Sequence, residues 1–115
     1  MNVNPKLTKE QQEQMGDIVA KLLAEKKAER EEMFNEIAEY NPKAMLLEPR
    51  EMYDHAVHGY SLEGRVIYSY REIIECLVVD DKMSEEDAVE HFDFNIRGTF
   101  EGMSDPNRPI FNMYL

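Results

Sequence analysis

The chain has 115 residues, with 24 acidic and 13 basic side chains, which give a formal net charge of −11 at pH 7. This charge repels a phosphate backbone, so it argues against direct nucleic-acid binding and favours partners with basic surfaces. No apolar run approaches the roughly 20 residues of a membrane-spanning helix, the single Cys76 excludes an internal disulfide, and residues 1–6 lack the apolar segment of a signal peptide. We therefore expect one domain, residues 1–115, in a reducing cytoplasm, without a membrane partner.

Residues 1–41 are predicted to form one long helix. Thr8 and Gln11 have the spacing of a capping box, and Pro42 stops the helix. Apolar residues recur at helical spacing in two groups separated by charged residues, whereas heptad core positions fall on glutamates, so a long regular coiled coil is not expected. We expect this helix to join two copies of the chain into a dimer. The predicted oligomer interface consists of Met15, Ile18, Val19, Leu22, Met33 and Ile37.

Residues 42–115 are predicted to form a small mixed module. Lys43 to Leu47 is expected to add a helical turn before Pro49. The segments His55 to Tyr60 and Arg65 to Ser69 are rich in strand-forming residues and predict a hairpin. The four residues between them, which include Gly64, are expected to form the turn.

Two helices with clear start signals follow the hairpin. Ser69 and Ser84 each begin a capping box, and each is followed by apolar residues at helical spacing. Gly98 is expected to end the second helix as a C′ glycine, and residues 110–114 are expected to add a short strand. The predicted fold class is therefore α+β, a long N-terminal helix followed by a ββααβ module.

The two capped helices carry a concentrated negative charge. Between residues 72 and 93 there are nine acidic side chains and one lysine, a local charge of −8. We predict that this acidic face binds a protein. It consists of Glu72, Glu75, Asp80, Asp81, Glu85, Glu86, Asp87, Glu90 and Asp93. Acidity that only keeps the protein in solution is the alternative interpretation.

Several segments of the module share a pattern with a known group of proteins. They are Tyr68-Ser-Tyr-Arg-Glu-Ile-Ile74, Met83-Ser-Glu-Glu-Asp-Ala88, Phe94-Asn-Ile-Arg-Gly98 and Pro109-Ile-Phe111. With them, residues 49–111 resemble a family of small uncharacterised proteins of bacteriophages and prophages. The family has no established reaction, so the resemblance implies a viral context in a bacterial cell and no catalytic residue.

The acidic helix pair matches neither a helix-turn-helix reader nor an EF-hand. A helix-turn-helix reader needs basic or amide side chains on its second helix, where this chain has carboxylates. An EF-hand loop beginning at Asp80 would have Lys82 at position three and Glu85 at position six, so the calcium signature fails. We expect neither DNA reading nor a metal site in this segment.

The remaining candidates for chemistry are two histidines and the cysteine. His55 and His58 lie near Asp54, and on a strand they would point to opposite faces. Adding His91 gives no zinc spacing. Cys76 lies among apolar residues beside Glu72 and Glu75, which would raise its pKa, so it is predicted to be a core residue.

Together these features predict a non-enzymatic interaction protein that binds a host or viral protein with a basic surface. In a sharper form, its carboxylates would imitate DNA phosphates and block a nucleic-acid-handling or defence enzyme. One alternative is a small enzyme or ligand-binding domain with a site at the hairpin, using His55 or His58 with Asp54. Another is a virion or assembly component built on the long helix. We expect no catalytic residue, cofactor or metal.

Overall fold

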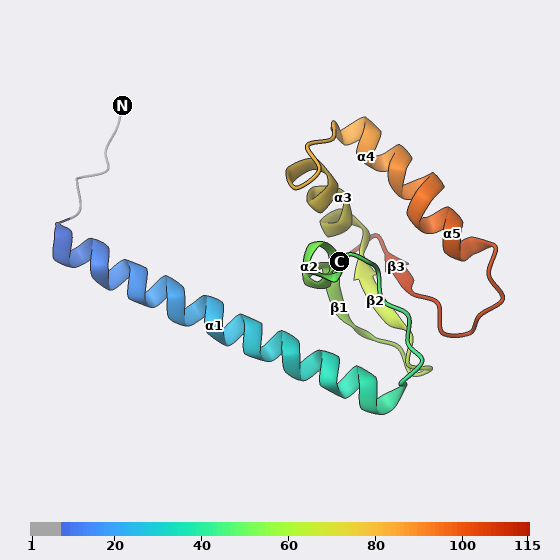
Figure 1. The fold of residues 1–115 in the computed structure, drawn as a ribbon, viewed down its shortest axis with the longest axis horizontal. Coiled ribbons are helices and arrows are strands. Elements are labelled where there is room, and N and C mark those ends of the chain that lie inside the picture. Colours follow the sequence, from blue (N-terminus) through green and yellow to red (C-terminus); the bar gives the residue numbers. More distant parts are fainter. Residues whose placement is uncertain (1–7) are drawn as a thin grey trace. The chain divides into compact units, whose positions relative to one another are not determined.

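The computed structural model describes residues 8–115 and divides the chain into two compact units, residues 1–33 and 34–115. Helix α1 (Lys9–Tyr40) contributes to both units. The division falls within α1 because its last residues belong to the second unit, where Ile37 is only 3% exposed. The second unit contains all the other helices and strands of the described part of the chain (Figure 1).

The long N-terminal helix is confirmed over Lys9–Tyr40, with the capping box at Thr8, whereas residues 1–7 of the predicted range lie outside the part of the chain that the structure describes. The backbone N–H of Gln11 donates to Thr8 Oγ1 at 3.1 Å, and the N–H of Thr8 donates to Gln11 Oε1 at 2.9 Å. This reciprocal pair satisfies two donors that a helix start otherwise leaves open. The helix ends at Tyr40, just before Pro42, whose ring is incompatible with helix continuation.

The predicted hairpin is also confirmed. Strands β1 (Val57–Tyr60) and β2 (Val66–Ser69) pair antiparallel, and β3 (Ile110–Asn112) pairs parallel with the other edge of β2. The strand order is therefore β1-β2-β3. A register shift between Val57 and Gly59 leaves His58 opposite no partner, as a β-bulge does.

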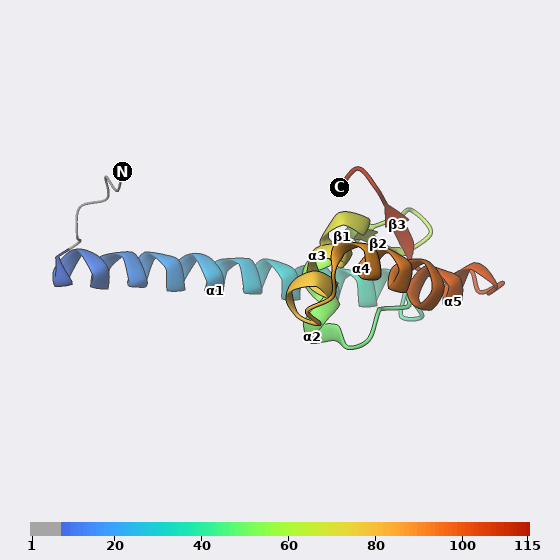
Figure 2. The same cartoon turned by 90° about the horizontal axis from the view of Figure 1, so that it is seen from above.

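Short helices before β1 and between β2 and β3 complete the module. Helix α2 (Arg50–Tyr53) and the 3-10 turn Asp54–Ala56 precede β1, and α3 (Tyr70–Val79) follows β2 directly. Helix α4 (Glu85–His91) continues through a π-helical segment, Phe92–Arg97, into α5 (Gly98–Glu101). Both views show α3 beside α4, and α4 leading on into α5 (Figures 1 and 2). The α+β fold with a ββααβ module is thus as predicted.

The two capping boxes predicted after the hairpin, at Ser69 and Ser84, begin helices as expected. Ser69 Oγ accepts a hydrogen bond from the N–H of Glu72 at 3.2 Å, and Ser84 Oγ accepts one from the N–H of Asp87 at 3.1 Å. The side-chain oxygen replaces a backbone acceptor that the first helical turn lacks. The caps therefore fix where β2 ends and α3 begins, and where the turn after α3 ends and α4 begins.

Gly98 does not end the last helix, contrary to the prediction. Its backbone is right-handed helical, with φ −58° and ψ −35°, and its N–H donates to the carbonyl of Asp93, five residues earlier. A Cβ on Gly98 would lie 3.0 Å from that carbonyl oxygen. The glycine therefore serves the close approach in the π-helical turn, and the helix ends instead at Gly102.

Two local assignments before the hairpin also need correction. Lys43 to Leu47 forms no helix; helix α2 begins after Pro49, which stands at its N-cap, where the missing N–H costs nothing. His55 lies in the 3-10 turn rather than in a strand, so β1 begins at Val57. The apolar residues along the sequence did not reveal where α2 or β1 begins.

The core of the second unit forms where α3 and the α4–α5 segment meet the sheet. Tyr68, Val66, Ile73, Leu77 and Ala88 are fully buried. An aromatic group joins the sheet to the π-helical segment, because the Phe111 ring lies 5.1 Å from that of Phe92 and 5.9 Å from that of Tyr68. These contacts anchor the final strand, whereas Tyr114 beyond it is 99% exposed.

Candidate functional site

The nine predicted carboxylates lie on α3, on the turn after it and on the α4 segment. Seven are exposed: Glu75, Asp80, Asp81, Glu85, Glu86, Asp87 and Glu90. The other two are half-buried and paired within the chain. A carboxylate oxygen of Glu72 lies 2.9 Å from His58 Nε2, and one of Asp93 lies 3.5 Å from Arg97 Nε.

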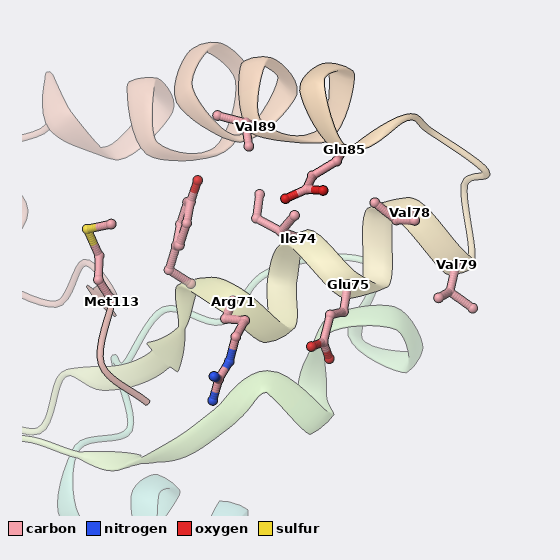
Figure 3. A pocket seen from close by; sticks show the side chains of 9 residues that line it. Arg71, Ile74, Glu75, Val78, Val79, Glu85, Val89 and Met113 are labelled. Carbon is pink, nitrogen blue, oxygen red and sulfur yellow. The ribbon is translucent and has the colours of Figure 1, made fainter.

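An open apolar groove of about 580 Å³ runs along α3 beside these carboxylates. Its apolar lining consists of Tyr70, Ile74, Val78, Val79, Val89 and Met113. In Figure 3, Ile74 points from α3 towards α4 and Val89 points back from α4, while Glu85 extends into the space between the two helices. Arg71 and Glu75 complete the lining on the other side of α3.

The groove is not evident from the sequence pattern. Apolar residues at helical spacing are typical of a core-facing stripe, and Ile73, Leu77 and Ala88 are indeed buried. Val79, however, is 71% exposed and Met113 is 72% exposed. The available signal was the width of the apolar arc on α3, where Val78 and Val79 extend it beyond the stripe that one core contact requires.

A second, smaller hollow of about 340 Å³ lies between α3 and the 3-10 turn. It is lined by His55, Glu72, Glu75, Cys76, Val79 and Asp80. One ligand atom from each of His55, Cys76 and Asp80 lies within 4.8 Å of the other two. Among the residues that the structure describes, this is the group of His, Cys, Asp and Glu side chains close enough to share a metal ion.

Cys76 is buried, as predicted. Its Sγ donates a hydrogen bond to the Met52 carbonyl at 3.2 Å, which ties α3 to α2. Burial raises the pKa of the thiol, and the negative charges of Asp80, Glu72 and Glu75 raise it further. The thiol is therefore held protonated at neutral pH, the opposite of what a nucleophile needs.

The enzyme alternative places a site at the hairpin, with His55 or His58 and Asp54. Asp54 forms an ion pair with Arg50 at 3.0 Å, and His58 contacts Glu72. His55 instead faces Cys76 and Asp80. The three residues thus have three different partners, and only His55 lines the small hollow.

The predicted oligomer residues fall into two classes. Met15, Ile18, Val19 and Leu22 are all more than half exposed, and Met33 is half-buried. Ile37 does not belong to the predicted oligomer interface, because it lies in the core of the second unit and is unavailable to a partner. The helical spacing could not separate these classes, because both groups lie on one face of α1.

Within residues 8–115, no helix combines the length and the apolar character that crossing a bilayer requires. Comparison with protein-family models, curated proteins and solved structures finds no match to this chain.

Proposed function

We propose that this protein is a non-enzymatic interaction protein that binds a partner protein in the groove along α3. The observation that carries the proposal is the groove itself, an open apolar surface with Glu75 and Glu85 among its lining residues. Concave apolar surfaces with polar edges are typical of protein-recognition sites. The most exposed lining side chains, Val79 and Met113, gain most from being covered.

The surroundings of the groove indicate the chemistry of the partner. Seven exposed carboxylates on and between α3 and α4 favour lysine and arginine side chains on the partner. An amphipathic segment with an apolar face and basic flanks would meet both requirements. The expected partner is therefore a host or viral protein with a basic surface, in line with the phage-type context that the resemblance implies.

A sharper form of this proposal is imitation of DNA. The exposed carboxylates would stand in for phosphates and occupy the basic channel of a nucleic-acid-handling or defence enzyme. It is supported by six exposed acidic residues between positions 80 and 90, among which Lys82 is the one basic residue; they are Asp80, Asp81, Glu85, Glu86, Asp87 and Glu90. Direct nucleic-acid binding by this chain is disfavoured by the same charge.

The test is partner capture by variants of the full chain in the natural host. One variant, Val79→Asp with Met113→Asp, places charges in the groove at positions that are already exposed. A second, E85K/E86K/E90K, reverses three carboxylates. Leu62→Asp is the matched control, because Leu62 is 91% exposed and lies in the hairpin turn rather than along the groove.

We expect one basic partner to be retained by the wild type and by Leu62→Asp, and to be lost from both test variants. Binding should also weaken as salt rises, because exposed charges are screened over about 8 Å at physiological ionic strength. A partner that the groove variant retains, or that binds independently of salt, would count against the proposal. Competition by DNA for the same partner would support the sharper form.

We also propose that α1 pairs with a second copy of the chain. Met15, Ile18, Val19 and Leu22 form one exposed apolar face, which a single helix leaves in water. Sedimentation equilibrium should give twice the mass of the 13.5 kDa chain, and Ile18→Lys with Leu22→Lys should restore the monomer. Ala24→Lys is the control, since position 24 lies on the opposite side of the helix from position 15. A monomeric wild type would refute pairing, and larger assemblies would favour the virion alternative.

A further inference from the structure

The hollow between α3 and the 3-10 turn combines three side chains of the types that bind transition metals. Cys76 lies on α3, and Asp80 is the C-cap residue four positions later with helical backbone angles, so the two lie on the same face. His55 comes from the turn Asp54–Ala56, which packs against α3. One ligand atom from each lies within 4.8 Å of the others.

The structure assigns His55, Cys76 and Asp80 as a three-residue site for a transition-metal ion, with zinc as the expected occupant. Sulfur, imidazole nitrogen and carboxylate oxygen are the three donor types that zinc accepts in proteins. The sulfur donor disfavours calcium and magnesium, which take oxygen ligands.

The geometry needs only a small contraction. At zinc bond lengths of about 2.0–2.3 Å, the donors of a tetrahedral site lie roughly 3.5 Å apart. The observed upper limit of 4.8 Å requires the donors to close by little more than about 1 Å. His55 and Asp80 are exposed and can move, whereas Cys76 is buried and gives up its S–H hydrogen bond to the Met52 carbonyl when it binds the metal as a thiolate.

The residues around the three ligands supply negative charge and a candidate for the fourth metal ligand. Glu72 and Glu75 line the same hollow, so a bound cation would lie among three carboxylates. Glu72 is already oriented by His58 at 2.9 Å, which leaves Glu75 or a water molecule as the fourth ligand. On binding, the Cys76 thiol loses its proton to solvent and forms the metal–thiolate bond.

The experiment is titration of the reduced, tag-free full chain with Co²⁺ and then with Zn²⁺. We expect one cobalt per chain, with a thiolate-to-cobalt charge-transfer band and the visible bands of a tetrahedral ion, both lost when zinc is added. Zinc should also raise Tm, because the metal binds the folded chain preferentially.

His55→Ala and Asp80→Asn should each lower zinc affinity by more than about 10-fold. Both positions are exposed, so these variants test the site even where Cys76→Ala disturbs the fold. Asp81→Asn and His91→Ala are the matched controls and should bind as the wild type does. Absence of stoichiometric binding, a cobalt spectrum without the thiolate band, or equal loss in Asp80→Asn and Asp81→Asn would overturn the proposal.

Discussion

The hydroxyl of Ser69 makes two hydrogen bonds, accepting from the N–H of Glu72 at 3.2 Å and donating to the main-chain oxygen of Leu115 at 2.8 Å. One fully buried side chain therefore begins α3 and anchors the segment after β3. The hydroxyl of Ser84 makes only the capping hydrogen bond, at the start of α4. The two serines form a natural pair for separating the two contributions.

Ser69→Ala should destabilise the protein more than Ser84→Ala does. Loss of an N-cap costs about 1 kcal/mol, and loss of the bond to Leu115 adds about 1 kcal/mol. Urea unfolding should thus give a decrease of about 2 kcal/mol for Ser69→Ala and about 1 kcal/mol for Ser84→Ala. Equal decreases would mean that the Leu115 contact contributes nothing.

Stability should fall at alkaline pH because of Tyr68. Burial raises the pKa of its hydroxyl from 10.0 to about 12, and the main cause opposing this rise is the hydrogen bond from the N–H of Leu47 at 2.7 Å. A raised pKa means that the folded state favours the neutral phenol, so the stabilisation is complete below pH 10 and is lost as the pH rises towards about 12. The loss should reach about 2–3 kcal/mol.

Urea unfolding across this pH range checks the sign, with Tyr68→Phe as the comparison. Phenylalanine cannot ionise, so its stability should depend less on pH, although it leaves the Leu47 N–H without its acceptor and is less stable at neutral pH by about 1–3 kcal/mol. Tyr53, whose pKa burial also raises, remains in both proteins. Parallel pH profiles would show that Tyr68 is not the titrating group.

Gly64→Ala should be strongly destabilising. Gly64 has φ +82°, and a Cβ there would lie 2.5 Å from the Asn41 Cβ. The left-handed backbone alone costs a non-glycine residue about 1–2 kcal/mol, and the clash adds to it. Gly102→Ala is the control, because nothing lies within 4 Å of its Cβ position and its φ is −83°. Thermal unfolding should separate the two variants clearly, and similar Tm values would contradict the tight approach to Asn41.

Phe111→Ala should also lower stability, by less than the roughly 3–5 kcal/mol of a fully buried phenylalanine, because Phe111 is half-buried. Its ring contacts Tyr68, Phe92 and Phe100 with centroid separations of 5.9, 5.1 and 6.2 Å. Removal of residues 111–115 should lower Tm at least as much, because the strand pairing with β2 is lost as well. Tyr114→Ala, at a 99% exposed position, should leave Tm unchanged. An unchanged Tm for the deletion would refute docking of this end.

Much of the fold could be predicted because its signals are local. The caps at Thr8, Ser69 and Ser84 involve residues three positions apart, so the sequence contains both partners of each hydrogen bond. The hairpin follows from two short strand-forming segments around Gly64. Gly98 was misassigned because a C′ glycine and a glycine within a π-helical turn look alike in sequence, and only the position of the Asp93 carbonyl separates them.

The candidate sites could be predicted only in part. The sequence located the acidic residues, but it could not show that Glu72 and Asp93 are paired within the chain while seven others are free to meet a partner. His55 and Cys76 are far apart along the chain, and no spacing rule connects them. Their meeting depends on how the 3-10 turn packs against α3.

The sequence by itself determined the starts of α1, α3 and α4, the hairpin and the charge of −11. These properties depend on neighbouring residues or on sums over the chain. Only the tertiary structure decided that Ile37 is core, that Val79 and Met113 border an open groove, and that His55, Cys76 and Asp80 share a hollow. The physical reason is that burial and side-chain proximity arise from packing between elements, and packing is not a property of any one segment.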